Sequence, residues 1–182
     1  MRKTAGFLKV ICIIALVFEV IGIAVVAIAL AAVAFMGKFS DIAAKTGNAI
    51  TISSTGTTLT PAEMDALKPV ILVAMGIALL TLVFAFLGTK KEKNVLAECQ
   101  AERPFSAKSV SELKSAARLE LIGGFIGVAG AFVMMFMGKN LQVNGTSVGN
   151  SSMSLNLSFL IYAVQKYLLY HVAEYGHSLE NR

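Results

Sequence analysis

The sequence predicts an all-α membrane protein with four transmembrane helices, arranged as two hairpins, and a small extracytoplasmic β-sheet. The 182 residues are 56% hydrophobic and only 15% charged, with a mean hydropathy of +0.73, which is far from the average of soluble proteins. The apolar residues gather in four runs, each of a length suited to a helix that crosses a bilayer. Between the second and third runs, residues 89–118 hold seven of the sixteen Lys and Arg residues.

The positive charges are placed as expected for membrane topology. The net charge is +5, and Arg2, Lys3 and Lys9 stand before the first apolar run. Lys and Arg are enriched in the cytoplasmic segments of membrane proteins, so we expect both termini and residues 89–118 in the cytoplasm. No nucleic-acid partner is expected. The two cysteines, Cys12 and Cys99, would then face a reducing compartment and form no disulfide.

The first span is predicted at residues 10–36, where Glu19 is the only charged residue. A helix of this length is about 40 Å long at 1.5 Å per residue, more than the ~30 Å hydrocarbon layer. The apolar core of a signal peptide is only ~7–15 residues long. We therefore interpret this run as a retained span rather than a cleaved signal.

The first outer segment, residues 37–68, predicts a hairpin followed by a helix. Residues 50–53 alternate apolar with polar side chains and continue through Thr55-Gly56 to Leu59, which is typical of a short hairpin. Thr60-Pro61-Ala62-Glu63 supplies an N-cap, a proline at the first helical position and an acid at the third. A helix should begin there, and Pro69 should bend or interrupt it before the second span at residues 70–87.

Residues 89–118 are predicted to form a helical elbow between the second and third spans. Residues 90–101 are rich in helix formers and should continue the second span. Arg103-Pro104 should end that helix, because the residue before a proline avoids helical angles. Ser106 is a candidate N-cap for the next helix, with Ser109 and Glu112 as an alternative capping pair.

The third span, residues 119–137, carries small residues at a spacing of four. Small residues on one face allow a neighbouring helix to approach closely in lipid. This stripe is either the seam of a homodimer or a site of packing within the chain, and its members are Gly123, Gly127 and Ala131.

The second outer segment, residues 138–156, contains Asn144-Gly145, which is a strong signal for a two-residue hairpin turn. Apolar residues alternate with polar ones after it, at Met153, Leu155 and Leu157. We expect the two outer segments to pair with each other into one small β-sheet.

The fourth span, residues 157–175, is apolar but has a polar face. Ionisable groups within a membrane normally face the protein interior or a wet cavity. With the inner boundary near Cys12 and Tyr175, a rise of 1.5 Å per residue places Glu19 ~10 Å and Lys166 ~13 Å deep. The second span has no ionisable residue, so we predict an ion pair between Glu19 and Lys166. The predicted intramembrane polar network comprises Glu19, Lys166, Tyr170, His171 and Glu174.

Motifs for catalysis or metal binding are weak. His171, Glu174 and His177 would have to spread over ~120° of one helix to hold a metal, and the chain has no other histidine. The sequence has no phosphate-binding glycine loop, no HExxH and no nucleophile elbow. We therefore expect no enzyme activity, no catalytic residue, no metal and no cofactor.

Two stretches carry a resemblance to a known family. Glu102-Arg103-Pro104-Phe105-Ser106, followed by Val110-Ser111-Glu112-Leu113-Lys114, resembles the central loop of a bacterial membrane family catalogued as domain of unknown function 2975. Gly176, Leu179 and Glu180 resemble that family's ending. The resemblance implies four spans and a bacterial plasma membrane, and it implies no catalytic residues.

Two classes of function remain. One is a non-catalytic interaction or regulatory subunit, alone or as a homo-oligomer, whose elbow presents cations to a partner or to anionic lipid; these are Lys90, Lys91, Lys93, Arg103 and Lys108. Orientation in the membrane alone also explains these positive residues. The other class is a small transporter or proton-coupled permease with a polar path of Glu19, Lys166, His171 and Glu174.

Overall fold

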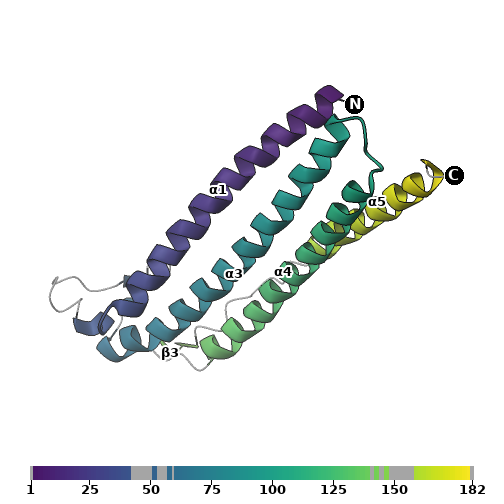
Figure 1. Ribbon diagram of the computed structural model, residues 1–182. Coiled ribbons are helices and arrows are strands. Elements are labelled where there is room, and N and C mark those ends of the chain that lie inside the picture. The colour runs from purple at the N-terminus through teal and green to yellow at the C-terminus, as the bar shows by residue number, and fades with distance from the viewer. Residues whose placement is uncertain are drawn as a thin grey trace. The chain divides into compact units, whose positions relative to one another are not determined.

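The computed structural model describes residues 2–41, 51–52, 57–58, 60–139, 142–143, 146–147 and 158–180. Four long helices make up most of this part of the chain (Figure 1). They are α1 (Arg2–Phe35), α3 (Pro61–Gln100), α4 (Ala107–Lys139) and α5 (Ser158–Glu180). Each contains one of the four apolar runs, so the order of helices agrees with the sequence prediction.

Three helices in the described residues are long and apolar enough to cross a membrane: Lys3–Phe35, Pro61–Gln100 and Ala107–Gly138. None of the most apolar 18-residue stretch of α1 or of α3 is buried. Large apolar side chains such as Phe18 (69% exposed) and Ile28 (70%) would be unfavourable in water. The described chain therefore fits an all-α membrane protein.

The start of α3 agrees with the prediction made from its sequence. The Thr60 backbone N–H donates to Glu63 Oε2 (2.8 Å), and the Glu63 N–H reaches back to Thr60 Oγ1 (3.4 Å), which is a capping box. Pro61 is the first helical residue, where a missing N–H leaves no hydrogen bond unmade. Of the two effects predicted for Pro69, the interruption is wrong, because α3 runs through this residue without a break. The bend stays a prediction.

Each outer segment contains one short antiparallel pair of strands. In the first, β1 (Thr51–Ile52) pairs with β2 (Thr57–Thr58). In the second, β3 (Gln142–Val143) pairs with β4 (Thr146–Ser147) across the two-residue Asn144-Gly145 connection. Among the described strands these are two separate sheets, so the single sheet that joins both segments stays a prediction.

The chain divides into two compact units. Unit 1 comprises residues 1–24, 80–127 and 156–182, and unit 2 comprises residues 25–79 and 128–155. The buried apolar side chains among the described residues of unit 1 are mostly small, namely Ala5, Ala116, Ala117, Ala163, Tyr170 and Ala173. Small side chains allow helix backbones to pack closely where lipid supplies no hydrophobic drive.

In unit 2, polar contacts join the end of α1 to the beginning of α3. Asp65 accepts hydrogen bonds from the Ser40 N–H (3.1 Å) and from the Ser40 hydroxyl (2.9 Å). The Lys68 ammonium donates to the carbonyl oxygens of Met36 and Gly37, just beyond the last residue of α1. A cation at this place also complements the negative end of the helix dipole.

Candidate functional site

The elbow between α3 and α4 is a closed turn. The Glu102 N–H donates to the Cys99 carbonyl (3.2 Å) and the Arg103 N–H to the Glu98 carbonyl (3.0 Å), the two bonds of a Schellman motif. Pro104 follows, and the Ser106 hydroxyl accepts from the Ser109 N–H (3.2 Å) to begin α4. The predicted helix end at Arg103-Pro104 and the predicted N-cap at Ser106 are therefore confirmed.

Glu98 holds the two sides of the elbow together. Its residue is 8% exposed, and its carboxylate lies 2.9 Å from Lys108 Nζ and 3.6 Å from an Arg103 guanidinium nitrogen. The Ser106 hydroxyl is a third neighbour, at 3.5 Å. The hydrogen bond from Lys108 is the main cause that lowers the pKa of Glu98, with Arg103 acting in the same direction.

A second set of contacts joins α3 to α4 nearer the membrane. Lys91 Nζ lies 2.8 Å from Glu112 Oε2, and the Asn94 amide donates to Glu112 Oε1 (3.2 Å). Lys91, Asn94 and Glu98 succeed one another at three- and four-residue intervals, so they share the helix face that meets α4. Lys90 and Lys93 are on a different face, and neither makes an ion pair in the described part of the chain.

The five cations predicted to contact a partner or lipid therefore fall into two groups. Lys91, Arg103 and Lys108 are engaged in ion pairs within the chain. The side chains that remain for an external partner are Lys90, which is exposed, and Lys93, which is half-buried.

Lys166 of α5 lies between two carboxylates. Its Nζ is 2.6 Å from Glu92 Oε1 and 2.6 Å from Glu120 Oε2, so one lysine joins α5 to both α3 and α4. The side chain of Lys166 is 21% exposed and those of Glu92 and Glu120 are 33% and 29% exposed. The cluster has one more negative than positive charge and spans three helices.

The predicted ion pair between Glu19 and Lys166 is wrong. Glu19 instead accepts a hydrogen bond from the Thr89 hydroxyl (2.8 Å), and its other carboxylate oxygen is buried without a hydrogen-bond partner. The prediction treated α3 as having no acid at the depth of Lys166. Because α3 continues as a helix beyond its apolar run, Glu92 reaches Lys166.

The remaining residues of the predicted network form a third group on α5. The Tyr170 hydroxyl donates to Glu174 (2.7 Å) and accepts from Lys114 of α4 (3.2 Å). The residue Tyr170 is 6% exposed. His171 Nδ1 lies 3.4 Å from Glu174, but these two side chains are 68% and 53% exposed. Tyr170 is thus buried against α4, whereas His171 and Glu174 are at the surface of the described residues.

Packing of the helices uses glycines that the sequence reading did not select. A Cβ at Gly123 would lie 3.0 Å from Phe84 of α3, so this member of the stripe is a close contact. A Cβ at Gly127, by contrast, would have no atom of another described residue outside its own helical turn within 4 Å. Ala131, the third member, is half-buried. Gly124 is the tightest of the described glycines, because a Cβ there would overlap the Phe159 ring of α5.

The two stretches that carry the family resemblance meet in unit 1. A Cβ at Gly176 of α5 would lie 2.7 Å from the ring of Phe105 in the elbow. Only a glycine lets α5 approach the elbow this closely at the present position of that ring. The elbow motif and the C-terminal glycine therefore form one packing contact.

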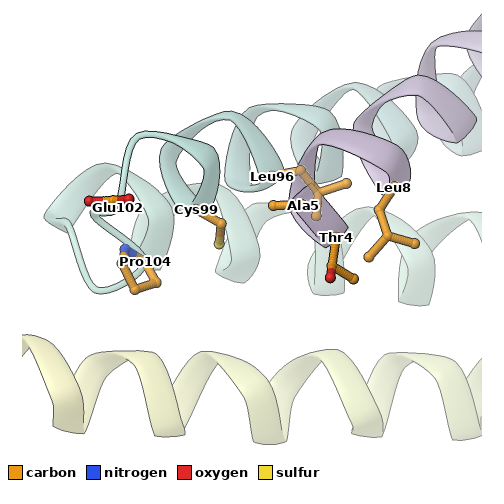
Figure 2. A pocket seen from close by; sticks show the side chains of 7 residues that line it. All are labelled: Thr4, Ala5, Leu8, Leu96, Cys99, Glu102 and Pro104. Atoms are coloured by element: carbon orange, nitrogen blue, oxygen red, sulfur yellow. The ribbon is translucent and has the colours of Figure 1, made fainter. Parts of the chain in front are cut away.

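A pocket of about 750 Å³ lies beside the elbow, between the beginning of α1 and the end of α3 (Figure 2). Its walls include Ala5, Leu8, Leu96 and Pro104, and also Thr4, Cys99 and Glu102. Nearby, Lys9 Nζ donates to the Gln100 side chain (3.2 Å), which joins α1 to α3. Sequence reading missed this pocket, because its walls come from segments about ninety residues apart.

The described residues contain no group of three or more His, Cys, Asp or Glu side chains placed to hold a metal ion. His171 and Glu174 are adjacent, as given above, but no third ligand of these types joins them in this part of the chain. When the chain was compared with protein-family models, with curated proteins and with solved structures, no match was found.

Proposed function

We propose that this protein is a non-catalytic interaction or regulatory subunit of a bacterial plasma membrane. The observation that carries the proposal is that ionisable side chains of this protein are engaged in ion pairs between its helices. Between the helices, Glu92, Glu98, Glu112 and Glu120 are each engaged with a lysine of another helix. Acids and bases held in this way stabilise a scaffold, and a scaffold with a fixed cytoplasmic elbow suits a docking role.

The proposed contact site for a partner consists of Lys90 and Lys93. These residues are three positions apart on α3, so their side chains share a face. Lys91, which lies between them in the sequence, turns to Glu112 on α4. Since Lys91, Arg103 and Lys108 are engaged in ion pairs within the chain, we place the contact with an acidic partner segment or with anionic lipid at the Lys90/Lys93 face.

The test is quantitative cross-linking and purification from native membranes of the wild type and of a Lys90→Glu/Lys93→Glu variant. Lys3 is also exposed and makes no ion pair with the described residues, so Lys3→Glu is the matched control for a charge change elsewhere. We expect a specific protein to be recovered with the wild type and the control and to be lost with the double variant. Equal recovery with all three proteins, or recovery of no protein above background, would contradict the proposed docking role.

The proposed topology has four crossings, with both termini and the elbow in the cytoplasm. The fourth crossing is supported by the apolar side of α5, where Ile161, Val164, Leu168 and Val172 are exposed and need a lipid environment. In intact cells, a membrane-impermeant maleimide should label a cysteine introduced at Ser147 and leave Cys99 unmodified. Labelling of Cys99 from outside would show that the orientation is opposite to the proposed one.

We also propose that the two outer hairpins pair into one sheet. Two-residue ladders are too short to be stable by themselves, and each leaves unpaired edges that the other can satisfy. Fast amide exchange at residues 51–58 and 142–147 would argue against a joined sheet.

The alternative of a proton-coupled permease has less support from the geometry. The four residues proposed for its path fall into three groups that no hydrogen bond or ion pair connects in the described part of the chain. Glu19 is with Thr89, Lys166 is with two glutamates, and His171 is exposed beside Glu174. Solute-dependent proton flux in proteoliposomes would nevertheless favour this class.

A further inference from the structure

The pocket beside the elbow has the size and the lining of a ligand site. Its volume of about 750 Å³ is within the range of ~300–1,000 Å³ typical of small-molecule sites. The lining is mainly apolar, from Ala5, Leu8, Leu96 and Pro104 (Figure 2). Such a lining favours an occupant with a hydrocarbon part.

The only charged side chain in this lining is Glu102. Its carboxylate makes no hydrogen bond or ion pair in the described part of the chain, whereas the adjacent Arg103 is directed to Glu98. A carboxylate beside an apolar pocket attracts a cationic group and repels an anionic one. The lining thus favours an occupant with a positively charged head.

The backbone at Glu102 gives a second, independent observation. Glu102 is the only non-glycine residue with a positive φ in the described part of the chain, at 62°. This is the position of the Schellman motif where glycine is usual, because a Cβ is sterically unfavourable in the left-handed region. Unfavourable backbone of this kind concentrates at functional sites. An acid at this position makes the turn less stable, and its side chain forms no compensating interaction with the described residues.

The location of the pocket suits an amphiphile. Thr4, Ala5 and Leu8 precede the apolar run at residues 10–36, and Leu96, Cys99 and Glu102 follow the run at residues 70–87. The pocket is therefore at the place where the apolar parts of α1 and α3 give way to polar sequence. At such a boundary an alkyl chain and its head group are both in a suitable environment.

We propose that this pocket binds an amphiphile with a linear alkyl chain and a primary ammonium head. The alkyl chain packs against Ala5, Leu8 and Leu96, and the ammonium pairs with the carboxylate of Glu102. This chemistry is shared by membrane lipids with an ethanolamine head and by free alkylamines. The site is independent of the Lys90/Lys93 face, which would bind groups of the opposite charge.

Cys99 gives a direct readout, because its thiol lines the pocket. In a Cys12→Ser background Cys99 is the only thiol, and intact-mass spectrometry follows its alkylation by N-ethylmaleimide in the purified full-length protein. The probes are octylamine, octanol and octanoate, which share an alkyl chain and differ in the charge of the head. We expect the alkylation rate of Cys99 to be at least threefold lower with octylamine than with octanol. Octanoate should lower this rate least.

The variants separate recognition of the charge from general effects. Glu102→Gln removes the charge and keeps the side-chain length, so octylamine should then protect no better than octanol. Asp41→Asn is the matched control, because Asp41 is an exposed acid without an interaction in the described residues, and it should behave as the parent. Equal protection by all three probes, protection by none of them, or strongest protection by octanoate would each overturn the proposal.

Reconstitution in nanodiscs distinguishes the two sources of the ammonium. If the ligand is a lipid, Cys99 should be alkylated more slowly in phosphatidylethanolamine than in phosphatidylcholine, and Glu102→Gln should abolish the difference. If the ligand is a free amine, the two lipids should give equal rates and added octylamine should still protect. Equal rates without protection by octylamine in either lipid would overturn the proposal.

Discussion

Replacement of Glu102 by glycine should make the protein more stable, although most substitutions destabilise a protein. Glu102 has a φ of 62° and forms no interaction with the described residues that the change would remove. Relief of the left-handed conformation is favourable by ~1–2 kcal/mol. Glycine also increases the entropy of the unfolded chain, which reduces the gain by ~0.5–1 kcal/mol. The expected net gain is about 0.5–1 kcal/mol.

The assay is thermal unfolding of the purified protein in one detergent, with Glu102→Ala as the control. A gain of this size corresponds to a rise in Tm of roughly 1–4 °C for a chain of this length. Alanine retains a Cβ in the same conformation, so Glu102→Ala should have a Tm close to that of the wild type. If glycine lowers the Tm, or if alanine raises it equally, then the left-handed backbone is not the source of the effect.

Three further predictions concern the contacts between helices. Gly124→Ala should destabilise the protein by ~1–3 kcal/mol in chemical unfolding, because its methyl group would overlap Phe159, whereas Gly127→Ala should be nearly neutral; equal effects would refute the packing described above. Lys166→Met should destabilise the protein by ~1–3 kcal/mol, because it leaves the carboxylates of Glu92 and Glu120 unpaired. Changing Glu92 and Glu120 to glutamine as well should recover part of this loss, and simple addition of the separate effects would argue against the cluster. Because the pKa of Glu98 is lowered in the folded state, its stabilising effect should be complete above the unfolded-state pKa of ~4.3 and should be lost as the pH falls through the folded-state value. A Tm difference between the wild type and Glu98→Gln that does not decrease as the pH is lowered below ~4.3 would contradict this.

The sequence by itself determined the features that depend on neighbouring residues. The apolar runs predict the long helices, since a helix that is exposed to lipid must be apolar over a known length. The capping box of Thr60 and Glu63 and the N-cap at Ser106 involve groups only three residues apart. The end of α3 at Gln100, shortly before Arg103-Pro104, agrees with the restriction that proline places on the residue before it. All these contacts form wherever the rest of the chain lies.

Only the tertiary structure decided which distant residues meet. Lys166 pairs with Glu92 and Glu120 rather than with Glu19, because α3 continues as a helix beyond its apolar run and carries Glu92 to that level. The rotation of each helix about its axis decides that Gly124 faces an aromatic ring and Gly127 does not. One residue along a helix changes the direction of a side chain by ~100°, and sequence periodicity does not specify which neighbour lies there. For the same reason the pocket of Cys99 and Glu102 was not predictable, since the beginning of α1 supplies its other wall.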